Sequence, residues 1–193
     1  MCGKMIYKPL LGMLMLIGVG QAQADLHQFS LLYSGGAFGN SATATGLITI
    51  DDQLTPNPTN DPTFLYLGAG QAVVDLSLVV SGASSGNGVF GLSDFDAVIW
   101  DTAGASLDWS SQLIGQATAN GGWGTAYDGT VGNFGLLANA ASSAPSSISY
   151  FEITTNNGNG DALDLVSILP LPAPSMAWLF AGSALGLLTQ RRR

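Results

Sequence analysis

Basic residues are confined to the two ends of this chain, and this layout limits how the chain can fold. Lys4 and Lys8 lie near the start and three arginines end the chain, whereas all 13 acidic residues lie between residues 25 and 164. Each cationic end adjoins an apolar segment, which is the pattern of a chain whose acidic middle crosses a membrane. The middle must therefore fold without a Lys or Arg salt bridge. It also lacks the basic surface that nucleic acid requires.

The first segment has the three parts of a secretory signal peptide. Lys4 and Lys8 precede an apolar run over residues 10–19, and Ala22 and Ala24 form a small-x-small site before Asp25. We expect a signal peptide over residues 1–24, export through the Sec route and cleavage before Asp25. The only cysteine, Cys2, would leave with this peptide, so the mature chain would have no disulfide.

The last segment combines a proline motif, a short apolar run and an arginine cluster. The apolar run predicts a single transmembrane helix over residues 173–189, with Trp178 at one interface and the arginines on the cytoplasmic side. The residues that carry this pattern are Pro170, Leu171, Pro172, Ala173, Pro174, Trp178, Arg191, Arg192 and Arg193.

Residues 169–193 resemble the PEP-CTERM sorting signal. In that signal a Pro-x-Pro motif is followed by a short apolar helix with Trp-Leu-Phe and Gly-Leu-Leu, and then by terminal arginines. Leu171 stands where the commonest form has Glu, and Pro174 adds to the spacing before Trp178. The resemblance implies processing by an exosortase near the proline motif, in bacteria that make an exopolysaccharide matrix. The precursor would be anchored in the inner membrane, and the product would reach the cell surface or the matrix. A plain C-terminal anchor is the alternative.

Residues 25–168 predict one all-β ectodomain, a single antiparallel β-sandwich of jelly-roll-like type. Period-two alternation bounded by Gly, Asn, Asp and Pro is the signal of short strands. We expect a loop at residues 56–62, a hairpin connection at 81–88 and one short helix at 110–116. The expected strands lie near residues 29–33, 46–50, 73–80, 89–92, 95–100, 134–138, 148–155 and 163–168.

Acidic pairs in turn-rich segments are candidates for calcium, which binds six to eight oxygen ligands. Asp94 with Asp96, and Asp161 with Asp164, are the best local pairs. The alternative interpretation is that these residues only form turns. No other cofactor is expected.

No residue constellation predicts an enzyme. His27 is the sole histidine and lies near the expected mature N-terminus. A glycan hydrolase could only use a carboxylate pair such as Glu152 with an aspartate.

Two aromatic residues are candidates for stacking on sugar rings, Trp123 and Tyr127. Gly121, Gly122 and Gly124 flank Trp123, so we expect this side chain to be exposed. Packing in the core is the alternative for both. The sequence thus favours a structural or adhesive surface protein, with a carbohydrate-binding module as the alternative and a glycan hydrolase after it.

Overall fold

The computed structural model describes residues 25–172. The predicted signal peptide with its cleavage residues Ala22 and Ala24 lies outside this range. So do the predicted transmembrane helix and the motif residues Ala173, Pro174, Trp178, Arg191, Arg192 and Arg193. In the range that is described, no helix has the length and apolar character needed to cross a membrane.

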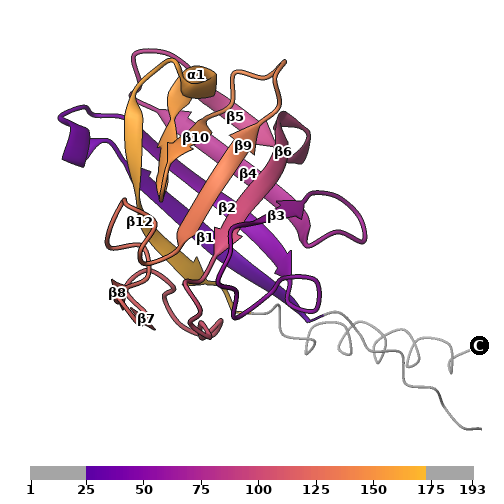
Figure 1. The fold of residues 1–193 in the computed structure, drawn as a ribbon. Coiled ribbons are helices and arrows are strands. Elements are labelled where there is room, and N and C mark those ends of the chain that lie inside the picture. Colours follow the sequence, from indigo (N-terminus) through magenta and orange to yellow (C-terminus); the bar gives the residue numbers. More distant parts are fainter. Residues whose placement is uncertain (1–24, 173–193) are drawn as a thin grey trace, which may run out of the picture.

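The described chain is mostly β and its sheets are antiparallel, as predicted (Figure 1). A large curled sheet has seven strands in the order β10-β11-β12-β1-β2-β4-β5. Their bounds are β1 Leu26–Ser34, β2 Thr43–Asp51, β4 Val73–Ser81, β5 Gly88–Gly91, β10 Ser146–Ser149, β11 Glu152–Thr154 and β12 Ala162–Pro170.

A smaller sheet of three strands, in the order β3-β6-β9, lies across the hollow of the large one (Figure 1). Its strands are β3 Thr63–Tyr66, β6 Phe95–Asp101 and β9 Asn133–Ala138. A short hairpin joins β7 Ala117–Thr118 to β8 Gly121–Gly122. The remaining elements are 3-10 turns at Gly36–Phe38 and Leu92–Asp94, and the four-residue α1, Thr155–Gly158.

The core forms between the two sheets because successive strand residues point to opposite faces. In β1, Phe29, Leu31 and Tyr33 are buried, as their alternation predicts. In β4, Leu76, Leu78 and Val80 are buried as expected. The same alternation predicts that Val74 lies on the buried face and Val73 on the opposite one. The start of β4 departs from this prediction: Val73 is buried and Val74 is not, since the pairing with β2 shifts register between Thr49 and Ile50. Such a bulge reverses the face on which the preceding side chains lie.

An aromatic cluster fills the core between the sheets. Trp123 is fully buried, and its ring lies 5.4 Å from Trp100, 6.5 Å from Phe134 and 5.0 Å from Phe151, measured between centroids. Its indole N–H donates to the Asp101 carbonyl at 2.8 Å. The prediction that Trp123 is exposed is therefore wrong, and this ring has no free face for a sugar.

The helix predicted at residues 110–116 is also wrong, because this segment forms turns. The Leu113 N–H donates to the Ile168 carbonyl of β12 and not to a carbonyl one helical turn earlier. Gly115 has a φ of 91°, which a right-handed helix does not accommodate. Contacts with β12 and the hairpin fix this segment in place of local helical bonds.

The last strand includes the first part of the proline motif. Pro170 is the final residue of β12 and pairs with Phe29, and the Leu171 N–H donates to the Gln28 carbonyl at 2.7 Å. The predicted domain end at residue 168 thus falls two residues before the strand ends at 170. The strand tolerates proline here because it is the terminal position of β12.

Candidate functional site

The outer face of the three-stranded sheet carries a groove with exposed aromatic walls. In the β3–β6–β9 register, Phe64 pairs with Ile99 and Ile99 pairs with Gly135. These residues alternate with the buried Leu65, Val98, Phe134 and Leu136, so they lie on the face that points away from the core. The Phe64 side chain is 54% exposed, and Tyr66, which lies on the same face of β3, is 62% exposed.

Strand β10 forms the second wall of the groove, and Gly135 lets it approach β9. A Cβ at Gly135 would overlap the Ser147 side chain at 2.8 Å. The Ser147 hydroxyl can therefore accept the Leu136 N–H at 2.8 Å, and the Ser146 hydroxyl accepts the Ala138 N–H at 3.2 Å. These two bonds connect the edge strand of the large sheet to the small sheet.

The groove encloses about 330 Å³. Its lining consists of Pro62, Phe64, Ile99, Asn133, Ser147, Ile148, Ser149 and Tyr150. None of these side chains is charged. The volume is at the lower end of the range for small-molecule pockets, which are mostly apolar with a few polar groups that fix orientation.

Asn133 supplies the polar group that stands out in this lining. The residue is only 7% exposed, and its Oδ1 is buried with no hydrogen-bond partner. A buried amide oxygen without a partner costs free energy, so most such groups have one. Solvent does not reach this oxygen, so a ligand hydroxyl in the groove would bond to it only after the Asn133 side chain turns. Aromatic faces and amides are the kinds of group that can contact an uncharged ring with hydroxyl groups.

Tyr127, the second predicted stacking residue, is 44% exposed, so its ring is open to solvent. Burial is the main cause that raises the pKa of the Tyr127 hydroxyl to about 12, and the neighbouring Asp164 carboxyl adds to this effect. Asp164 pairs across β11–β12 with Glu152. Burial is the main cause that raises the pKa of both carboxyls, and the charge of Asp164 adds to the effect on Glu152.

This pairing makes Glu152 and Asp164 cross-strand neighbours on one face of the sheet. They do not line the groove of Phe64 and Asn133. Glycan hydrolysis stays a prediction that the geometry does not test.

The structure gives two of the calcium candidates hydrogen-bond partners, Asp94 within a turn and Asp161 across to a distant loop. Asp94 accepts the Gly91 N–H and the Ser142 hydroxyl, each at 2.8 Å, and Asp96 is exposed. Asp161 accepts the Ser84 N–H at 2.5 Å. Within residues 25–172, neither predicted pair belongs to a group of three close carboxylate or imidazole side chains. Calcium at these residues stays a prediction.

The sequence interpretation missed β3 and hence the exposed wall of the groove. The signal was present, because residues 63–66 alternate after Pro62, with Leu65 pointing inward. Asn133 had no sequence signal, since its burial depends on β6 and on the segment that leads to β10. Comparison with protein families, with curated proteins and with solved structures finds no match to this chain.

Proposed function

We propose that this chain is an exported bacterial protein of the cell surface or extracellular matrix, sorted by an exosortase from an inner-membrane precursor. Its β domain, in this proposal a jelly-roll-like sandwich, has a structural or adhesive role among exopolysaccharides. Crossings of the chain between the two sheets, from β2 to β3 and from β5 to β6, support the sandwich. We propose no enzymatic role and no binding to nucleic acid.

The observation that carries the proposal is the junction of β12 with the proline motif. Pro170 is held in the sheet by its pairing with Phe29, whereas Pro172 is exposed. The motif therefore starts where the fold ends, with no linker between them. A protease that acts just beyond Pro170 would release a domain whose strands are all retained.

Mass spectrometry of the intact protein, recovered separately from cytosol, envelope and matrix, tests export and sorting. We expect the surface form to begin at Asp25 and to end close to the motif of Pro170 to Pro174. A chain found in the cytosol with both Lys4 and Arg193 still attached would contradict the proposal.

Carbohydrate binding is the second candidate function, and the groove of Phe64 and Asn133 favours it. The mature protein should bind an uncharged glycan in an array or by affinity electrophoresis with host exopolysaccharide. Phe64→Ala should weaken that binding about fivefold, because the stacking energy of an aromatic face is about 1 kcal/mol.

Phe38→Ala is the matched control, since Phe38 is a similarly exposed phenylalanine, at 42%, on the 3-10 turn Gly36–Phe38. This variant should bind as the unaltered protein does. If both variants lose glycan binding equally, or neither loses it, the groove is not the binding site. The sorting proposal would then still stand on the mass measurement.

A further inference from the structure

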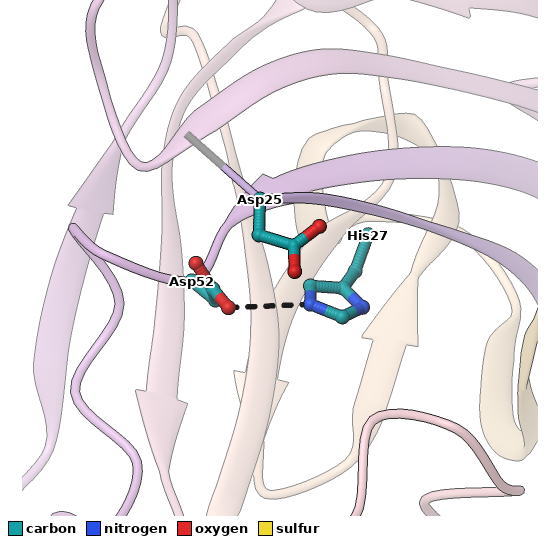
Figure 2. Close-up of side chains that lie close together, drawn as sticks. All are labelled: Asp25, His27 and Asp52. Carbon is teal, nitrogen blue, oxygen red and sulfur yellow. Dashed lines mark hydrogen bonds and ion pairs between the residues drawn. The ribbon is translucent and has the colours of Figure 1, made fainter. Parts of the chain in front are cut away.

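A second cluster of side chains lies at the start of β1 (Leu26–Ser34), where the described residues begin. Asp25 directly precedes β1, His27 is the second residue of β1, and Asp52 directly follows β2. The Asp52 N–H donates to the Asp25 carbonyl at 3.2 Å, which fixes the two aspartates opposite each other. Figure 2 shows the three side chains turned toward a common space, with His27 Nε2 at 3.3 Å from Asp52 Oδ2.

The ligand atoms of these three side chains lie close enough together to coordinate one metal ion. One ligand atom from each of Asp25, His27 and Asp52 lies within 4.8 Å of the others, and this is the one such group in the described part of the chain. Ligand atoms that each lie about 2.0–2.2 Å from one zinc ion are separated by up to about 4 Å, so small side-chain rotations close the site.

The charges of the cluster are not balanced by a basic residue. No Lys or Arg occurs between residues 25 and 172. The Oδ1 atom of Asp52 is buried and has no hydrogen-bond partner. Among the described residues, His27 is the only side chain of a basic type, and it lies beside Asp52 with 3.3 Å between Nε2 and Oδ2.

The surroundings hold the imidazole in place and leave the cluster accessible. The His27 ring packs against Trp109, with centroids 5.2 Å apart, and against Phe29 at 6.4 Å. The side chains of His27 and Asp52 remain 28% and 33% exposed. A cavity of about 400 Å³ that includes Asp25, His27 and Trp109 in its lining gives an ion a path from solvent.

We propose that Asp25, His27 and Asp52 form a binding site for a divalent transition-metal ion of the zinc class. An imidazole nitrogen with two carboxylate oxygens suits zinc, copper or nickel better than calcium, which prefers oxygen ligands alone. Three protein ligands leave the fourth tetrahedral position of zinc open. Cleavage before Asp25 would add an α-amino group on the same residue, which can fill that position as a chelate with the Asp25 carboxylate.

Such an ion would join the first residues of β1 to the chain after β2. The same cavity is lined by Pro170, Leu171 and Pro172, so the ion would sit beside the point where the fold meets the proline motif. This site is separate from the groove of Phe64 and does not depend on the proposed function.

The test is zinc binding to the full chain, produced with its own export signal and purified from the envelope in detergent. Titration calorimetry after treatment with a chelator should give one zinc ion per chain, and zinc should raise the melting temperature. His27→Gln and Asp52→Asn should each weaken zinc binding at least about tenfold, as the loss of a ligand does. Asp75→Asn is the control, since it removes an equal charge from an exposed position on β4 and should bind zinc normally.

Cobalt as a replacement ion gives a second readout, because its visible absorption reports nitrogen and oxygen ligands directly. That absorption should disappear in His27→Gln, while circular dichroism in chelator shows that the variant is folded. Absence of stoichiometric zinc binding would overturn the proposal. So would unchanged zinc binding in both site variants, or calcium that binds more tightly than zinc.

Discussion

The two faces of the three-stranded sheet use aromatic residues in opposite ways. On the inner face, Trp100 and Phe134 are buried and pack with Trp123 and Phe151. On the outer face, Phe64 and Tyr66 are more than half exposed. The two groups are separated by the thickness of one sheet, and β3 itself alternates between them. The strand face on which an aromatic side chain lies, and not its residue type, decides whether it packs in the core or is exposed to solvent.

The largest expected effect in this comparison comes from Trp123→Ala. Removal of a fully buried indole should lower the free energy of unfolding by about 3–5 kcal/mol, because it leaves a cavity and an unpaired Asp101 carbonyl. Phe64→Ala should lower it by only about 0.5 kcal/mol, as an exposed position does. Urea denaturation of both variants measures the difference.

Trp123→Phe keeps an aromatic ring in the cluster and allows a measurement if the alanine variant does not fold. Its free energy of unfolding should lie between those of the other two variants, because only the indole hydrogen bond and part of the side-chain volume are lost. Equal stability of the Trp123 and Phe64 variants would show that the two faces do not differ as described.

The same comparison explains how far the sequence could predict this fold. Alternation in β1, and in β4 from Leu76 onward, correctly indicated which residues form the core, because a regular strand fixes the face of each side chain. The glycines around Trp123 were misleading. A Cβ at Gly132 would overlap the Trp123 indole, and a Cβ at Gly124 would approach the Phe151 ring at 3.3 Å. These glycines let backbone pack closely on aromatic rings, and they do not present the rings to solvent.

Candidate sites were harder to predict than strands, because they depend on pairing between distant segments. Asn133 lies in the groove through the register of β6 with β9, and His27 meets Asp52 through the register of β1 with β2. The spacing of these residues along the sequence predicts neither of these two placements. Of the acidic pair Asp94 and Asp96, which was chosen from local spacing, Asp94 caps the turn at Leu92–Asp94 and Asp96 is exposed.

A smaller effect is expected at the partly buried carboxyls of β11 and β12. Because burial raises the pKa of Glu152, its contribution to stability is greatest below about pH 4 and is lost as the pH rises through the raised value. Glu152→Gln should therefore raise the free energy of unfolding at pH 7 by a few tenths of a kcal/mol, roughly, after solvent screening. The gain should vanish in acid, which urea denaturation across pH can show.

Asp128→Asn provides a control of opposite sign. The Thr130 hydroxyl and N–H donate to Asp128 and lower its pKa, so its contribution is present above about pH 4 and is lost as the pH falls. The variant should be less stable than the unaltered protein at neutral pH, and the loss should shrink in acid. If both variants change the free energy of unfolding at neutral pH in the same direction, the explanation given for these two carboxyls is refuted.

Hydroxyl-radical footprinting with mass spectrometry tests the contrast between the two faces most directly, because it reports the solvent exposure of each aromatic side chain in the folded protein. Phe64 and Tyr66 should be oxidised readily, while Trp100 and Trp123 should be protected until denaturant is added, although indole is intrinsically the more reactive ring. Rapid oxidation of Trp123 in the native protein, together with protection of Phe64, would contradict the account.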